Sequence, residues 1–294
     1  MKMKIAVASC CKIQSTDPQP VWDLIRNETP DVLLLIGDNI YLDHDRHSDP
    51  DALGKELDDL YKLQLAEPHF ASLLADLRAR NAPVIAIYDD HDFLGNNRYG
   101  ADYPPGLRDA ARKAFTTAFN PRMTGNDVYS VARLGLVDII VLDERFYRSS
   151  PSVSAWDRDA ILGQAQWSWL EQTLGASSNA KYTLIASSTT IHTFGDESWE
   201  QYPGAFQRLN KLLAHQVGKL VVSGDVHRNA AYDDSGVIEI VTSGVARNGI
   251  VFGSPRQNFG FLTFDQDSLH VNLRSLKAGG RFDFRIPLSR WELP

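Results

Sequence analysis

The sequence predicts an α/β fold, and three observations lead to this prediction. Short runs rich in Val, Ile and Leu recur along most of the 294 residues. Longer stretches between them repeat Leu or Trp at the spacing of one helix face. The short runs are continuously apolar rather than alternating, which is the pattern of strands covered on both faces. Strands and helices that alternate in this way are typical of α/β proteins.

Six apolar runs are predicted to form buried strands. They are residues 4–9, 31–37, 83–88, 136–142, 182–187 and 220–223. Five intervening stretches are predicted helices, at residues 51–61, 68–80, 106–119, 164–174 and 204–215. In the fourth helix Trp167, Leu170 and Leu174 share one face, and Gly175 is its candidate C-cap.

The end of the chain has a different pattern. Four strand-like runs, 237–242, 259–264, 269–274 and 282–286, are joined by short turns such as 265–267 and Gly279-Gly280. Short turns predict an antiparallel segment from about residue 237 onward. No fixed-period repeat and no linker rich in Ser, Pro or Gly divides the sequence, so residues 1–294 are predicted to form one domain.

The composition excludes several classes of protein. With 43% hydrophobic and 23% charged residues, the chain is neither disordered, collagen-like nor coiled coil. The two cysteines, Cys10 and Cys11, are adjacent and cannot form a disulfide framework. Apolar runs such as 32–36 are too short to span a bilayer, and no signal-peptide core follows Met1. A cytoplasmic, reducing location is therefore expected.

The net charge limits the choice of partner. A formal charge of −7 argues against a nucleic-acid backbone or an anionic membrane as the main partner. A small phosphate substrate stays possible, because a bound metal ion can reverse the local field. The sequence leaves the oligomeric state open.

Acidic residues directly follow four of the predicted strands. They are Asp38, the pair Asp89-Asp90, Asp143 and Asp225. Ligands of open α/β sheets bind at the carboxyl ends of the strands. Carboxylates gathered there would repel one another and be costly to bury, and a metal ion is the usual remedy. A single Asp is more often a helix cap or turn residue, but the set favours a metal site.

Histidines accompany two of these acids. Asp225 and His227 are two residues apart, so in regular strand geometry both would face one side and offer an oxygen and a nitrogen ligand. His91 follows Asp90 and suits proton transfer. His192 follows another strand and fits either a ligand or an ordinary polar residue.

Three further residues each allow two interpretations. Cys10, at the end of the first strand, is either a small buried hydrophobe or a thiolate ligand. Tyr41, three residues after Asp38, is either a packed aromatic or a phenolate ligand of a strongly acidic metal such as ferric iron. Asn97 fits a turn or a neutral oxygen ligand of a hard cation.

Taken in order, these motifs resemble those of the alkaline phosphatase D (PhoD-like) metallophosphatases. The matching segments are 8–10 (ASC), 37–41 (GDNIY), 89–92 (DDHD) with Asn96-Asn97, 142–145 (LDER), 162–167 (LGQAQW), 197–199 (ESW), 223–227 (SGDVH) and 258–260 (NFG). The family is similar to the calcineurin-like phosphoesterases. The resemblance therefore implies a four-layer α/β/β/α double-β sandwich with a metal cluster at one edge.

The resemblance also implies a metal set. Ferric iron would be surrounded by Cys10, Asp38, Tyr41 and His227. Asp38 would bridge to a second metal ion that is also held by Asp90, Asn97 and Asp225. The second ion would be calcium, with manganese, zinc or magnesium as alternatives.

The expected activity is hydrolysis of small phosphate monoesters or diesters. Two metal ions lower the pKa of a bridging water, and the resulting hydroxide would attack phosphorus. His91 would protonate the leaving oxygen, and Arg145 would bind non-bridging oxygens through its planar guanidinium. Arg98 and Arg247 offer the same chemistry, although surface salt bridges are their more common role.

Two other functions stay open. The first is hydrolysis of another ester on the same scaffold, because pocket walls rather than metals set the substrate. Candidate walls are Tyr99, Trp156, Trp199 and Tyr202, for which packing is an equally common role. The second is a non-catalytic, metal-binding member of the fold.

Overall fold

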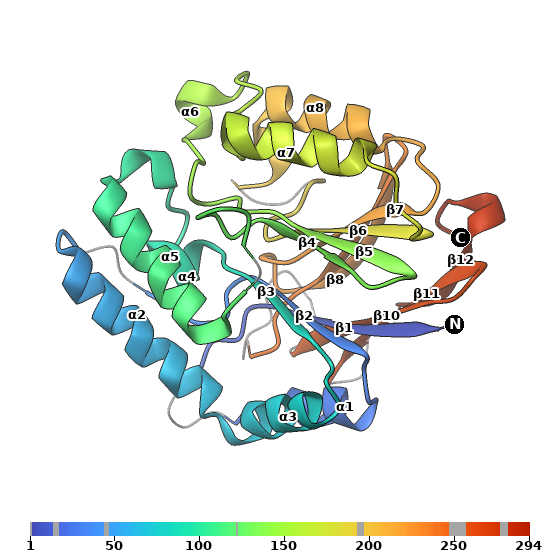
Figure 1. The fold of residues 1–294 in the computed structure, drawn as a ribbon, viewed down its shortest axis with the longest axis horizontal. Helices are drawn as coiled ribbons and strands as arrows, with labels where there is room; N and C mark the ends of the chain where they lie inside the picture. The colour runs from blue at the N-terminus through green and yellow to red at the C-terminus, as the bar shows by residue number, and fades with distance from the viewer. Residues whose placement is uncertain are drawn as a thin grey trace.

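The computed structural model describes residues 2–13, 18–43, 47–121, 123–192, 197–246, 257–276 and 282–294. Two six-stranded mixed sheets lie face to face, with helices on both outer sides (Figure 1). The first sheet has the strand order β12-β11-β10-β1-β2-β3, and the second β4-β5-β6-β7-β9-β8. This arrangement confirms the predicted α/β class and the four layers that the resemblance implies.

The first sheet joins the beginning of the chain to its end. Its parallel strands are β1 (Met3–Ala8), β2 (Val32–Ile36) and β3 (Val84–Ile87). Its antiparallel strands are β10 (Asn258–Phe264), β11 (Ser268–Ser275) and β12 (Phe282–Pro287), of which β10 pairs with β1. Hydrophobic side chains from Ile5 to Ile286 therefore share one core.

The second sheet has four parallel strands between two antiparallel edges. The parallel strands are β5 (Val137–Val141), β6 (Tyr182–Ser187), β7 (Lys219–Ser223) and β9 (Val237–Thr242). The edges are β4 (Ser130–Arg133) and β8 (Asn229–Asp234). The sequence did not predict these two strands, because edge strands are half exposed and lack a continuous apolar run.

The position of β9 differs from the prediction. It was expected to open an antiparallel C-terminal segment, but it pairs in parallel with β7 and antiparallel with β8. The antiparallel tail consists of β10, β11 and β12 instead. All six residues of β9 are buried, and a buried strand has the same sequence pattern whether it pairs in parallel or antiparallel. The sequence therefore could not give the direction of pairing.

Helices cover both outer faces (Figure 1). The outer face of the second sheet packs against α7 (Gly163–Gly175) and α8 (Pro203–Leu213). The first sheet is covered by α1 (Val21–Asn27), α2 (Pro50–Leu65), α3 (Pro68–Ala79) and α5 (Pro105–Phe119). Short turns form α4 (Asp90–Phe93), α6 (Pro151–Ser154), η1 (Gly100–Asp102), η2 (Trp199–Gln201) and η3 (Leu288–Arg290).

Alternating burial explains why central strands are apolar throughout. In β5, Ile139 and Val141 enter the core between the sheets, whereas Ile140 packs toward α7 and α8. The helices follow the predicted spacing, with Leu53 and Leu57 buried on one face of α2. Helix α7 runs one residue further than predicted, so Gly175 is its last residue and Ala176 is the C-cap.

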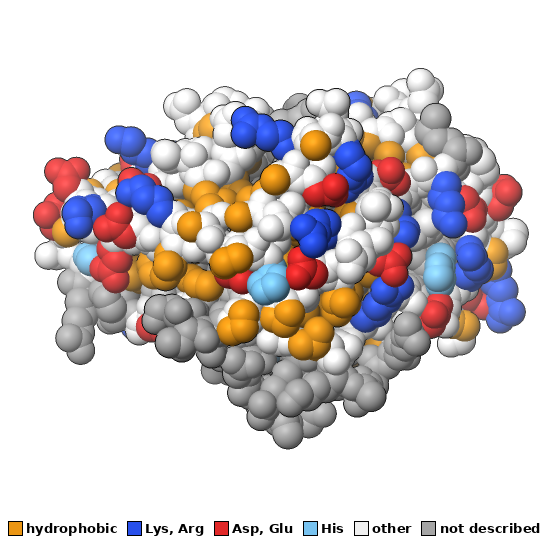
Figure 2. Space-filling model, turned by 90° about the horizontal axis from the view of Figure 1, so that it is seen from below, with side chains coloured by type: hydrophobic (Ala, Val, Ile, Leu, Met, Phe, Trp, Pro, Cys, Tyr) orange, Lys and Arg blue, Asp and Glu red, His pale blue; other side chains and the backbone are white. Residues whose placement is uncertain are grey.

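Charges of both signs are interspersed on the face seen from below in Figure 2. Neighbouring side chains of the lower helices form ion pairs, such as Asp23 with Arg26 at 3.0 Å and Asp76 with Arg80 at 2.8 Å. The negative charge is therefore locally balanced on these helices. Among the described helices, none combines the length and apolarity needed to cross a membrane.

Candidate metal centre

The polar residues singled out in the sequence follow parallel strands of both sheets. Cys10 follows β1, Asp38 follows β2, Asp89 and Asp90 follow β3, and Asp225 and His227 follow β7. Three sets of their ligand atoms lie within 4.8 Å of one another: Cys10 with Asp38 and His227, Asp38 with Asp90 and His91, and Asp38 with Asp89 and Asp225. Asp38 belongs to all three sets and is the centre of the cluster.

On one side of Asp38 lie a thiol, a phenol and an imidazole. The hydroxyl of Tyr41 donates to Asp38 Oδ2 at 2.9 Å and lies 3.2 Å from His227 Nε2. Cys10 Sγ lies 3.4 Å from the same Asp38 oxygen. The four residues expected around ferric iron therefore lie together, joined through Asp38 and Tyr41. Cys11 packs into the hydrophobic core and offers no ligand to the cluster.

On the other side of Asp38 the candidate ligand atoms include several carboxylate oxygens. Asp90 accepts the backbone N–H groups of His91 at 2.8 Å and of Asn97 at 2.7 Å. Two buried carboxylate oxygens, Asp38 Oδ1 and Asp89 Oδ2, have no hydrogen-bond partner in the described structure. A buried carboxylate oxygen without a donor is costly, so this side of the cluster fits a hard cation.

Burial raises the pKa values of three groups in the cluster. Burial, followed by the nearby Cys10 and Asp90, raises the pKa of Asp38 well above its usual value. Burial and the neighbouring carboxylates do the same to the pKa of Asp225. Burial raises the pKa of the Cys10 thiol to about 12, against a smaller opposing effect of Ser243. A bound cation reverses this preference, because it stabilises the ionised forms of its ligands.

Five of the predicted ligands have a left-handed backbone. The φ angles are 57° at Cys10, 52° at Asp38, 55° at Asn97, 65° at Asp225 and 52° at His227. This conformation costs a non-glycine residue about 1–2 kcal/mol and is concentrated at functional sites. It also corrects one prediction: β7 ends at Ser223, so the loop, and not regular strand geometry, brings Asp225 and His227 to the cluster.

His91 lies at the open edge of the cluster, with 13% of its side chain exposed. Its Nδ1 is 3.3 Å from the backbone carbonyl of Leu42, and its ring centre is 4.1 Å from that of Tyr41. A carbonyl only accepts, so Nδ1 carries a hydrogen in this contact. Nε2 is then the ring nitrogen left for proton exchange with a substrate.

Arg145 lies in a different place from the one that its expected role requires. It is fully buried, with Nε 2.5 Å from Asp89 Oδ1 and both terminal nitrogens 2.8 Å from the two oxygens of Glu197. All three of its nitrogens donate to carboxylates, so the guanidinium is not exposed to substrate. The geometry makes Arg145 a partner of Asp89, and burial of this kind is not readable from the sequence.

The remaining candidate residues lie outside the three ligand sets or outside the described residues. His192 is buried outside the ligand sets, and its Nδ1 is 3.1 Å from Glu239 Oε2. Arg98 is half-buried, whereas Arg247 lies outside the described residues. Of the candidate walls, Trp199 and Tyr202 are fully buried packing residues, Tyr99 is half-buried, and Trp156 is 73% exposed.

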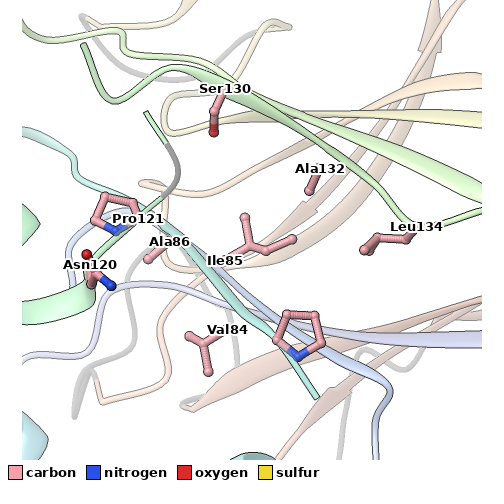
Figure 3. A pocket seen from close by; sticks show the side chains of 9 residues that line it. Val84, Ile85, Ala86, Asn120, Pro121, Ser130, Ala132 and Leu134 are labelled. Atoms are coloured by element: carbon pink, nitrogen blue, oxygen red, sulfur yellow. The ribbon is translucent and has the colours of Figure 1, made fainter. Parts of the chain in front are cut away.

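A cavity of about 160 Å³ lies away from this cluster, between the two edge strands β3 and β4 (Figure 3). Its lining includes Val84, Ile85, Ala132 and Leu134, with Ser130 as a polar member. None of the residues lining it is an acid, a histidine or a cysteine. The cavity therefore offers no carboxylate, imidazole or thiol to a metal ion.

Gly37 is required by the close approach of Asp89. It has φ +93°, and a Cβ there would lie 2.6 Å from Asp89 Cβ. We expect Gly37→Ala to lower the free energy of unfolding by about 2–5 kcal/mol, from backbone strain plus overpacking. Gly125→Ala is the matched control, because Gly125 has φ +64° and open space around it. Equal losses in chemical denaturation would show that the contact with Asp89 is unimportant.

Comparisons with known proteins bear on the family and the fold of this chain. The family model of PhoD-like phosphatases matches residues 5–257. A solved structure described as "Structure of PhoD" is 19% identical, with a TM-score of 0.75, over 97% of this chain and 70% of that chain. Zinc-bound Vps29 from Entamoeba histolytica is 10% identical, with a TM-score of 0.40, over 97% and 99%. No curated protein sequence matches.

The family match covers nearly all of the strands and loops that build the cluster. It begins in β1 and extends past β9, so it includes every residue of the three ligand sets. The chain is therefore a member of the PhoD-like phosphatase family and a phosphoric ester hydrolase.

Proposed function

We propose that this phosphatase hydrolyses small phosphate monoesters or diesters at a two-metal centre built around Asp38. The observation that carries the proposal is that Asp38 belongs to all three sets of ligand atoms. PhoD-like and calcineurin-like phosphatases use metal ions, and one carboxylate shared by two donor sets suits a bridging ligand. When bound, two ions activate a water and neutralise phosphate charge.

The donor types divide the centre into two sites. Cys10, Tyr41 and His227, with one oxygen of Asp38, form a set that suits ferric iron, because thiolate and phenolate stabilise a strongly acidic ion. Asp90 and Asp225, with Asp38, would supply carboxylate oxygens that suit calcium or another divalent ion. Asn97 would add its amide oxygen, which accepts from Asn96 Nδ2 at 3.0 Å, while its backbone N–H donates to Asp90 Oδ2 at 2.7 Å. Lys12 lies near the first site, with Nζ 5.3 Å from the centre of the Tyr41 ring.

His91 has the protonation role in this proposal. Its Nδ1 is held by the Leu42 carbonyl and its ring by Tyr41, which orients Nε2. As imidazolium it delivers the Nε2 proton to the leaving oxygen, and as imidazole it takes a proton back. Arg145 has no direct part in binding the phosphate, because Asp89 and Glu197 occupy its nitrogens.

The activity test uses protein purified without chelator and three p-nitrophenyl substrates: the phosphate, the bis-phosphate diester and the acetate. We expect turnover of a phosphate ester, loss of turnover after chelation, and recovery when a divalent ion is restored. Turnover of acetate alone would favour the other ester hydrolase. A centre without metal and without turnover would favour a binding protein.

Cys10→Ser is expected to lower the iron content at least about tenfold, because a hydroxyl is a far weaker ligand than a thiolate. Elemental analysis and the visible tyrosinate–iron absorption of Tyr41 measure the loss. Cys11→Ser is the matched control, since Cys11 is the adjacent buried cysteine and packs in the core. Full iron content in Cys10→Ser would leave Cys10 as a core residue only.

A further inference from the structure

Asp89 has no role in the proposed centre, yet it lies inside it. A carboxylate oxygen of Asp89 lies within 4.8 Å of ligand atoms of Asp38 and Asp225. The side chain is 1% exposed, and Oδ2 has no hydrogen-bond partner in the described structure. The resemblance assigned Asp90, the next residue, to the metal. The adjacent carboxylates of Asp89 and Asp90 therefore both belong to the cluster, but only Asp90 has a role in the proposed centre.

The other oxygen of Asp89 is firmly held. Oδ1 accepts from Arg145 Nε at 2.5 Å and from the hydroxyl of Ser188 at 2.6 Å. The backbone N–H of Asp89 donates to Asp92 Oδ2 at 3.0 Å. These contacts hold the backbone and Oδ1 of Asp89 in place. Asp89 is also the N-cap residue of α4, in a capping box with Asp92.

Arg145 does not balance the charge of this region. Its two terminal nitrogens bind Glu197 in a bidentate pair at 2.8 Å each, so one guanidinium is shared by two buried carboxylates. The three groups together carry one negative charge when all are ionised. When ionised, Asp38, Asp90 and Asp225 would add more of the same sign nearby. Buried charges need a counter-charge, and a water molecule would supply a hydrogen bond but no charge.

We propose that Asp89 Oδ2 is a ligand of the second metal ion, together with Asp38 and Asp225, and that Arg145 and Ser188 present it by holding Oδ1. The proposal rests on the two-metal centre proposed above. It also explains the glycine at position 37, because a side chain there would displace Asp89. Arg145 is thus a positioning residue that acts through Asp89.

The test is a calorimetric titration of metal-stripped, iron-reconstituted protein with Mn²⁺ alone and with Ca²⁺ alone. Asp89→Asn keeps the shape and an acceptor for Arg145 but removes the charge. We expect its Kd for the divalent ion to rise at least about 100-fold, because loss of a group that only supports a ligand already costs about 10–100-fold. Its iron content should stay unchanged, because Asp89 is absent from the set that contains Cys10 and His227.

Glu144→Gln is the matched control. Glu144 is fully buried and also has one oxygen without a partner, but it belongs to none of the ligand sets found among the described residues. Its removal should leave the Kd of Mn²⁺ unchanged. If Asp89 has only a structural role, Asp89→Asn will leave the Kd unchanged or will lose iron and the divalent ion together. Either result overturns the proposal.

Two outcomes separate this inference from the proposed function. Wild-type protein that takes up no second ion contradicts the two-metal centre itself. Wild-type protein that binds Mn²⁺ no better than Asp89→Asn contradicts only the role of Asp89. If Asp89→Asn does not fold, Ser188→Ala decides, because it releases one contact of Oδ1. A Kd about tenfold higher supports the proposal, and an unchanged Kd overturns it.

Discussion

Asp38→Ala is expected to empty both proposed metal sites and to lower kcat/KM for a phosphate ester by about 10³-fold or more. Asp38 is the one residue common to the three ligand sets. Two bound ions would supply several kcal/mol of transition-state stabilisation, and each 1.36 kcal/mol corresponds to a tenfold change in rate. Elemental analysis and steady-state kinetics on the same preparation measure both effects.

Asp143→Asn is the control for this substitution. Asp143 is fully buried and also follows a parallel strand, β5, but its oxygens accept from the Tyr88 hydroxyl and from the backbone N–H groups of Arg145 and Phe146. Its folded fraction should keep both metals. Retention of both ions in Asp38→Ala would contradict a centre organised around Asp38.

His91→Ala is expected to lower kcat by about 10²–10⁴-fold, the usual contribution of a general acid, with metal content unchanged. The loss should be largest for esters with poor leaving groups, such as alkyl phosphates, because p-nitrophenolate leaves readily without a proton. His69→Ala is the control, since His69 forms a surface ion pair with Asp23 on α1. Measurements of kcat against leaving-group pKa separate the two variants.

Metal analysis distinguishes the acid role from a ligand role. One of the ligand sets joins His91 to Asp38 and Asp90, so its geometry permits either role. A loss of metal as large as the loss of turnover would make His91 a ligand. A loss that is equal for good and poor leaving groups would also remove the protonation role.

The sequence predicted where the candidate ligands gather because the order and direction of the strands determine which loops meet. Parallel pairing brings the carboxyl ends of β2 and β3 together, and the packing of the two sheets brings the end of β7 to the same place. The same reasoning missed β4 and β8, whose exposed edges lack an apolar run. It also misplaced β9, because periodicity does not report the direction of pairing.

Side-chain roles within the centre were harder to predict. Asp89 and Asp90 are adjacent and chemically identical, and only their contacts distinguish an oxygen held by Arg145 from one held by the N–H of Asn97. Arg145 was expected at the substrate because its planar guanidinium can bind two phosphate oxygens at once. Its burial depends on Glu197, which lies 52 residues further along the chain. Such pairs form only in the folded protein.

The cluster draws its ligands from both sheets. Cys10 and Asp38 follow strands of the first sheet, whereas Asp225 and His227 follow a strand of the second. An ion held by Asp38 and either of the latter two would thus cross-link the two sheets. Separation of the sheets at this end would then require release of the ion, at a cost of about 2.7 kcal/mol when its concentration is 100 times Kd. Starvation for metal would then expose this phosphatase to proteolysis as well as silence it.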